Sequence, residues 1–243
     1  MHRSPARIAA VLLGAMFLLL TWLLYKGDFW SLHTPQQKVD AIVEYASAEP
    51  EDTSSLRAVL HPEVVFDETI GDRRILVFTD TEIDGLVGQI QFRRGLLGGW
   101  QPLSASYHAG GVIRSTALKD RNIRVVYAVD CPPEVAHYMV APVENQPETV
   151  MAEGDVTASR FFHVYKTDRD FFPSIYLYDT QGNLLDSADY LATDQSIPSP
   201  SIGSAETDLV YWFCAVLLAV GYVIVKYLWD LGGPSAKKEE TVP

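Results

Sequence analysis

The sequence predicts an α+β protein, mainly β, in which two membrane-spanning helices enclose one polar domain. Uncharged apolar runs lie near both ends of the 243-residue chain, at residues 8–25 and 209–225. Between them, apolar residues first recur at the spacing of a short helix and then mostly at the spacing of β-strands. We therefore expect an ectodomain of one or two helices followed by antiparallel strands.

The first apolar run, residues 8–25, has no charge over 18 positions and is bounded by Arg7 and Lys26. At about 1.5 Å per residue, a helix of this length covers roughly 27 Å, close to the thickness of the hydrocarbon core of a bilayer. A cleaved signal peptide would need a small-residue cleavage site, and no A-x-A pattern occurs before Thr34. We expect an uncleaved transmembrane helix.

The second apolar run belongs to a predicted transmembrane helix over residues 208–229. Aromatic residues, which favour the headgroup layer, lie at both of its ends. They are Tyr211, Trp212, Tyr227 and Trp229. A buried core helix would not need this distribution, and the preceding residues 196–200 lack the LPxTG-type signal of a protein sorted to a cell wall.

Basic residues indicate how the two spans are oriented. Two arginines precede the first span and three lysines accompany or follow the second, whereas only Lys26 lies on the opposite side. Because such residues are enriched in cytoplasmic segments, residues 1–7 and the tail 230–243 are expected in the cytoplasm. The domain, residues 27–192, is then expected outside the cell membrane, with residues 193–207 as a flexible Ser/Pro-rich tether.

The predicted ectodomain is strongly acidic. Residues 27–207 contain 27 Asp and Glu against 13 Lys and Arg, a formal charge of −14. This charge repels nucleic acids and anionic lipid headgroups. The two spans make the lipid bilayer the expected partner, and another membrane or envelope protein is the alternative. Cys131 lies in the domain and Cys214 in the second span, so no intrachain disulfide is expected.

The domain is expected to begin with a helix over residues 35–47. Thr34 and Gln37 form a capping-box pattern around a first-turn proline, and an apolar stripe follows at helical spacing. A second short helical turn is expected over residues 53–60. The predicted strands then lie at 64–66, 75–78, 87–92, 102–107, 112–118, 123–129, 138–141, 159–165 and 174–178, the last pairing with Leu184 and Leu185 across a hairpin.

The best metal candidate is an acidic run. Asp80, Glu82 and Asp84 alternate before Gly85, as in the first half of a calcium loop. The twelfth position of such a loop needs a bidentate glutamate, and this chain has Gln91 there. An acidic turn is the simpler interpretation, so we expect no metal or other cofactor. We also expect no catalytic residues, since neither G-x-S-x-G, H-E-x-x-H nor a phosphate-binding loop occurs.

An aromatic-rich segment supplies the candidate contact surface. Phe171, Phe172, Tyr176 and Tyr178 are the residues that could form a shelf for a ligand or partner. The two tyrosines alternate with aliphatic residues, however, which is also typical of a strand with two packed faces. Packing in the core is the simpler interpretation, and the shelf remains the alternative.

The same segment carries a resemblance. F-F-H-V-Y at 161–165 and F-F-P-S-I-Y-L-Y-D-x-x-G-N-L-L at 171–185, with G-L-L-G-G-W upstream at 95–100, resemble uncharacterised membrane-anchored ectodomains of Gram-positive bacteria. The resemblance covers about half of the domain. It implies a small β-rich domain of the cell envelope and supplies no activity.

Three functional hypotheses follow. The first is a non-enzymatic membrane protein whose ectodomain binds or senses something at the cell envelope. The second is an accessory subunit whose spans pack against a larger membrane complex through small residues. These are Gly14, Ala15, Ala215, Ala219 and Gly221. An envelope hydrolase is the third.

Overall fold

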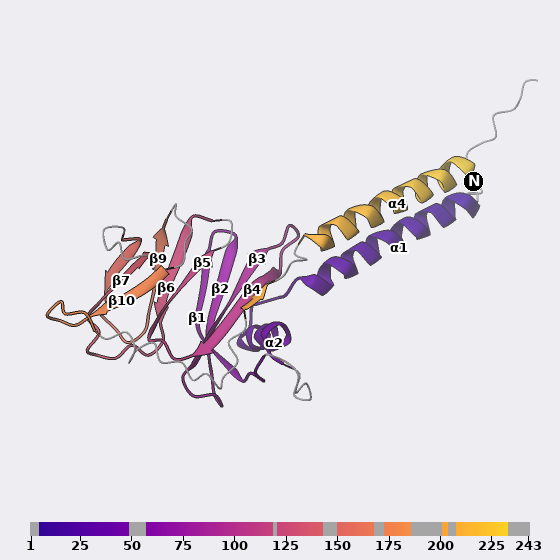
Figure 1. Cartoon of the computed structure of the whole chain (residues 1–243). Coiled ribbons are helices and arrows are strands. Elements are labelled where there is room, and N and C mark those ends of the chain that lie inside the picture. Colours follow the sequence, from indigo (N-terminus) through magenta and orange to yellow (C-terminus); the bar gives the residue numbers. More distant parts are fainter. Residues whose placement is uncertain are drawn as a thin grey trace, which may run out of the picture. The chain divides into compact units, whose positions relative to one another are not determined.

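The computed structural model describes residues 5–48, 57–118, 121–142, 150–167, 173–185, 201–203 and 208–232. The chain forms two compact units, one from its two end segments and one from residues 31–204. The predicted fold class is confirmed, because a long helix lies near each end of the described chain and a short helix and antiparallel sheets lie between them (Figure 1).

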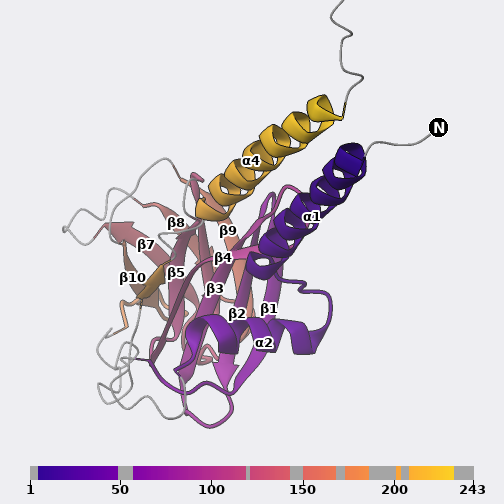
Figure 2. The ribbon, with the colours of Figure 1, turned by 90° about the vertical axis from the view of Figure 1, so that its right-hand side faces the viewer.

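Two antiparallel helices form the first unit. They are α1 (Pro5–Asp28) and α4 (Leu209–Leu231), and they lie side by side in Figures 1 and 2. The guanidinium of Arg7, near the start of α1, lies 5.4 Å from the ring centroid of Trp229, near the end of α4. This cation–π contact requires the helices to run in opposite directions, as a chain that crosses a membrane twice would need.

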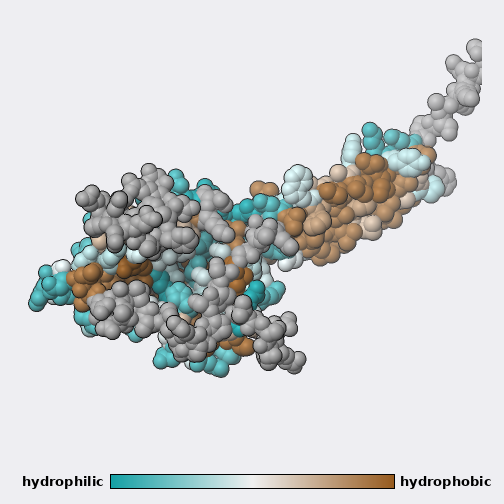
Figure 3. All heavy atoms as spheres, viewed as in Figure 1, coloured by the Kyte–Doolittle hydropathy of each residue, from teal (hydrophilic) through white to brown (hydrophobic). Residues whose placement is uncertain are grey.

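Glycine allows close contact between these helices. A Cβ on Gly221 would lie 2.7 Å from Cγ of Phe17, and one on Gly14 would lie 3.6 Å from Cγ2 of Val225. The outward side chains are apolar and exposed, as at Leu18, which is 63% exposed (Figure 3). Both helices are long and apolar enough to cross a membrane.

The second unit begins with α2 (Pro35–Ala46), whose predicted capping box is confirmed. The Gln37 amide donates to Thr34 Oγ1 at 3.2 Å, and the Thr34 amide donates to Gln37 Oε1 at 3.1 Å. These bonds satisfy amides that a helix start leaves without partners. The helix lies across one face of the first sheet (Figure 2) and buries Ala41 and Ile42.

Antiparallel strands form three sheets. Sheet A has the order β1 (Pro62–Ile70), β2 (Arg73–Asp80), β3 (Leu86–Arg94), β4 (Trp100–Ala109) and β11 (Ser201–Gly203). Sheet B has the order β5 (Ile113–Leu118), β6 (Ile123–Ala128) and β9 (Phe161–Lys166). Sheet C has the order β10 (Pro173–Tyr178), β7 (His137–Pro142) and β8 (Ala152–Asp155).

The structure differs from the sequence prediction in three places. Strand β8 was not predicted, because Ala152–Asp155 has no apolar alternation. Strand β11 lies inside the predicted tether and pairs with β4, and the rest of residues 193–207 lies outside the described residues. Residues 57–60, the second half of the expected helical turn, are not helical, and its first half lies outside the described residues.

Sheet B is the middle layer of the domain (Figure 1). One of its faces packs on the β1–β2 side of sheet A, and the other packs on sheet C. Adjacent residues of β6 divide between these two cores: Val125 and Tyr127 face sheet A, whereas Val126 and Ala128 face sheet C. With α2 on the far face of sheet A, the layers run α2, sheet A, sheet B, sheet C.

Adjacent phenylalanines in β9 follow the same division. The ring of Phe161 stacks on Tyr138 of sheet C, with centroids 5.4 Å apart. Phe162 points the other way, and its ring lies 5.6 Å from that of Phe66 in sheet A. Adjacent side chains of a strand point to opposite faces, and because sheet B is covered on both sides, each face has its own core.

A hydrogen-bonded chain of side chains joins sheets B and C. Tyr138 Oη lies 2.6 Å from His163 Nδ1 and also contacts the hydroxyl of Tyr165. The Tyr165 hydroxyl donates to the carbonyl of Glu153 at 2.9 Å. Gly154 leaves room for this chain, since a Cβ there would lie 2.8 Å from Tyr138 Oη. The hydroxyl of the buried Tyr138 is thus satisfied inside the protein.

Replacement of Phe161 with alanine should therefore destabilise the domain strongly. Phe161 is only 8% exposed, and loss of a buried ring typically costs about 3–5 kcal/mol. Phe162, half-buried on the other face, should cost less but still about 2 kcal/mol or more. Urea unfolding of the full chain in mild detergent would measure both. If both Phe161→Ala and Phe162→Ala cost under about 0.5 kcal/mol, the two-core description is wrong.

Candidate functional site

The face of sheet A that looks toward sheet B is apolar on β1 and β2 and polar on β3 and β4. Strand β4 alternates strictly, so its small and polar residues share one face. These residues are Ser104, Ser106 and His108. On β3, Gln89 and Gln91 pair with Ser106 and Ser104 and extend the polar half.

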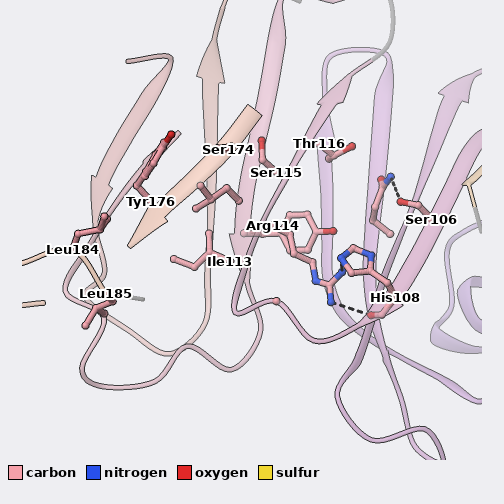
Figure 4. A pocket seen from close by; sticks show the side chains of 14 residues that line it. Ser106, His108, Ile113, Arg114, Ser115, Thr116, Ser174, Tyr176, Leu184 and Leu185 are labelled. Carbon is pink, nitrogen blue, oxygen red and sulfur yellow. Dashed lines mark hydrogen bonds between the residues drawn. The ribbon is translucent and has the colours of Figure 1, made fainter. Parts of the chain in front are cut away.

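A cleft of about 690 Å³ opens at this polar half (Figure 4). Its walls are the polar residues of β3 and β4, the edge strand β5 of sheet B and the edge strand β10 of sheet C. On β5, Arg114 and Thr116 face sheet A, whereas their neighbours on β6, Tyr127 and Val125, pack in the apolar core. The cleft opens at these two polar positions, and Leu118 at the far end of β5 still packs in that core. Its volume lies in the range of small-molecule sites.

Arg114 carries the charge of the cleft. Its side chain is only 6% exposed, and its guanidinium contacts Nε2 of His108 and the carbonyls of His108 and Gly110. Its Nε is buried without a hydrogen-bond partner among the described residues. All of these contacts are neutral, and no ion pair joins Arg114 to a carboxylate in the part of the chain that the structure describes. The buried positive charge is therefore uncompensated there.

The β4–β5 turn holds the carbonyls against Arg114. Gly110 and Gly111 have φ values of 76° and 81°, which glycine adopts without strain. This turn brings the carbonyl oxygens of residues 108 and 110 to the Arg114 side chain. Burial lowers the pKa of Arg114 to about 10, which leaves the guanidinium charged at neutral pH.

His108 is neutral in this environment. Burial and the neighbouring charge of Arg114 lower its pKa to about 4. Because Arg114 donates to Nε2, the proton of the neutral ring lies on Nδ1. His108 therefore accepts a hydrogen bond and does not neutralise the arginine.

The cleft has an apolar end opposite Arg114. Figure 4 places Leu184 and Leu185 there, with Ile113 nearer the centre and His108 at the other end. Leu184 is 59% exposed and forms a β-bridge with Tyr178 at the end of the edge strand β10. The cleft is therefore amphipathic along its length.

The cleft is also lined by Gln89, which carries a buried hydrogen-bond acceptor. Gln89 donates through Nε2 to Ser106 Oγ at 3.2 Å, whereas its Oε1 is buried without a partner among the described residues. The cleft thus contains one buried donor and one buried acceptor, on Arg114 and Gln89, whose hydrogen-bonding capacity is not used within the described chain. Such groups normally find a partner, so a bound ligand could supply it.

The acidic residues singled out in the sequence lie elsewhere and form a turn. Asp80 Oδ2 accepts from the His61 amide at 2.6 Å, and Oδ1 accepts from the amides of Glu82 and Ile83 at 2.9 Å each. Glu82 pairs instead with the ring of His61, at 3.4 Å. Asp84 follows in the turn, and no group of three metal-binding side chains occurs among the described residues. Both carboxylate oxygens of Asp80 already accept hydrogen bonds from backbone amides.

Of the four aromatic residues proposed as a contact shelf, the two tyrosines occupy different places. Tyr176 lines the cleft from β10. Tyr178 does not line it; its ring lies 6.0 Å from that of His137. Phe171 and Phe172 lie outside the described residues, so the expected aromatic shelf remains a prediction.

Sequence reasoning missed Arg114 and His108. The available signal was an arginine inside residues 112–118, a segment that was predicted to be a strand. A charge in such a strand usually points to solvent, so this signal was weak. Only the register of β4 against β3, and the position of β5 over them, brings the two side chains together.

The low pKa of His108 predicts a loss of stability on mild acidification. The pKa of His108 is lower in the folded protein than the usual 6.5, so the unfolded state binds a proton more readily. The free energy of unfolding is therefore highest above pH 6.5 and falls as pH drops toward 4. Between pH 7 and 5, the loss should not exceed about 1.4 kcal/mol per pH unit. His108→Gln should flatten this dependence, and His33→Gln is the control. Equal pH profiles for wild type and His108→Gln would contradict this prediction.

Calcium should not stabilise the protein, because the backbone occupies the oxygens of Asp80. We expect thermal unfolding curves in calcium and in chelator to coincide. Asp80→Ala should cost about 1–2 kcal/mol through loss of its backbone hydrogen bonds, whereas the exposed control Glu82→Ala should cost under about 0.5 kcal/mol. A rise in melting temperature with calcium that Asp80→Ala abolishes would establish a metal site.

No family model, curated protein or solved structure matches this chain. An assignment of function therefore depends on the geometry of the cleft and on the two apolar helices. Both are properties of the chain itself, and both can be tested by substitution.

Proposed function

We propose that the chain is a two-span membrane protein of the cell envelope whose β domain lies outside the cytoplasm and binds a ligand in the cleft. The length and apolar surface of α1 and α4 support the two spans. The distribution of basic residues supports cytoplasmic ends. The resemblance to Gram-positive envelope domains agrees with this placement and remains part of the proposal.

The observation that carries the binding function is Arg114. A charged side chain that is 94% buried, given its 6% exposure, costs folding free energy unless a partner compensates it. The chain retains this cost at the wall of a cleft of small-molecule size. Local destabilisation of this kind is typical of sites where a ligand completes the hydrogen bonding.

Binding explains the cleft better than hydrolysis does. The hydroxyl of Ser106 accepts from Gln89, and the ring nitrogen His108 Nε2 accepts from Arg114. His108 is thus occupied and does not contact Ser106 as a general base would. Among the described residues of the lining, no hydrogen bond joins a hydroxyl to a side chain that could act as its general base.

The accessory-subunit hypothesis loses part of its basis. Gly14 and Gly221 were candidates for contact with another membrane protein, but they lie against Val225 and Phe17 of the same chain. Within the described residues, no specific observation favours that function over ligand binding.

Fusions should reveal the orientation. A reporter that is active only outside the cytoplasm should be active when fused after residue 120 and inactive when fused after residue 243. The physical reason is the retention of the basic flanks in the cytoplasm. The opposite pattern, or activity at both positions, would refute the proposed topology.

Occupancy of the cleft can be tested without knowledge of the ligand. Ser174 lines the cleft from β10, and Ser174→Trp should fill it. Native mass spectrometry of full chain taken from its own membranes in mild detergent should find a small molecule bound to wild type. Ser174→Trp should lose it, whereas Leu96→Trp, at a position 85% exposed, should keep it. Equal retention in both variants would place binding outside the cleft.

A further inference from the structure

We infer that the ligand of this cleft is a small amphipathic anion, with its oxyanion on Arg114 and its apolar group between β5 and β10. This inference rests on the proposed binding function and specifies the chemistry of the ligand. It follows from how the cleft distributes charge and apolar surface along its length.

The charge of Arg114 determines the sign of the ligand. Its neighbours His108 and Gly110 supply only neutral acceptors, and its Nε still lacks one among the described residues. A carboxylate or phosphate oxygen would satisfy Nε through a charge-assisted hydrogen bond and compensate the buried charge. A cationic ligand would be repelled, and a neutral one would leave the charge uncompensated.

The net charge of the domain limits the size of the anionic group. With a formal charge of −14 over residues 27–207, long-range repulsion opposes polyanions such as nucleic acids. A single oxyanion that reaches Arg114 gains a short-range contact at low dielectric, where the interaction is much stronger than in water. The pocket therefore favours small ligands with one anionic group.

The opposite end of the cleft favours an apolar group. Ile113, Ile175, Leu184 and Leu185 contribute aliphatic surface to the lining. In Figure 4 the labelled aliphatic side chains lie away from His108, so a ligand with an anionic group at one end and a short hydrocarbon chain at the other would match both ends. Each buried methylene would add to the affinity.

Hexanoate and its neutral isostere hexanamide test this inference on the full chain in mild detergent. Unfolding can be followed by the reaction of Cys131 with a thiol dye in a Cys214→Ser background. Cys131 is only 4% exposed in the core between sheets B and C, and burial raises its pKa to about 11, so it reacts when the domain unfolds. The two probes share a chain length and differ in the charge of the head group.

Hexanoate should raise the melting temperature in a saturable way, because it binds only the folded state. Hexanamide should need roughly 10- to 100-fold higher concentration for the same shift, the usual value of a charge-assisted hydrogen bond. Acetate, which lacks the apolar chain, should also bind more weakly. Hexyl phosphate separates the two oxyanion classes: whichever of hexanoate and hexyl phosphate binds more tightly identifies the natural group.

A variant at His108 tests the role of Arg114 without removing it, since Arg114→Gln could fail to fold. His108 contacts the guanidinium directly, so His108→Glu would give Arg114 a carboxylate from the chain itself. This variant should fold and lose the hexanoate shift. The charge control Arg94→Gln, which removes an exposed charge on β3 outside the cleft, should keep the hexanoate shift.

Three results would overturn the inference. They are equal shifts with hexanoate and hexanamide, an unchanged hexanoate shift in His108→Glu, or no shift with either hexanoate or hexyl phosphate. The proposed binding function would survive any of them if Ser174→Trp still lost a co-purified molecule. It would fail separately if that variant kept the molecule.

Discussion

The fold depends on a middle sheet that is apolar on both faces. In β6 the consecutive residues Val125 and Val126 are both fully buried, one against sheet A and the other against sheet C. Full burial of such a side chain contributes about 1.5–3 kcal/mol. Because one short strand supplies side chains to two cores, sheets A and C each need only one apolar face against it, and neither could keep its position without sheet B.

The cleft is a consequence of where this apolar contact stops. On β5, the neighbour of β6, the polar residues Arg114 and Thr116 face sheet A opposite Tyr127 and Val125 of β6. Gln91 of sheet A donates to Thr116 Oγ1 and to the Ala117 carbonyl, both at 3.1 Å, so hydrogen bonds replace apolar packing there. Arg114 likewise contacts His108 across the two sheets, and the cleft opens beside these polar contacts. The alternation of side chains along each strand, which builds the apolar core, therefore also produces the cleft.

Local patterns made much of the fold predictable. The capping box at Thr34 and the alternation in β4 act over a few residues, so the sequence indicates them directly. Strands β8 and β11 were missed, because pairing with neighbours stabilises them and their own residues carry no apolar period. The site was the least predictable part. His108 and Arg114 lie on different sheets, and their meeting depends on how those sheets pack.

Native-state hydrogen exchange tests the central role of sheet B most directly. If this sheet is buried on both faces, the amides of β6 should exchange only through global unfolding and should be the slowest in the domain. The amides of β8, at the edge of sheet C, should exchange faster through local opening. Exchange of β6 as fast as that of β8, under conditions where the domain remains folded, would contradict the three-sheet arrangement and the cleft that depends on it.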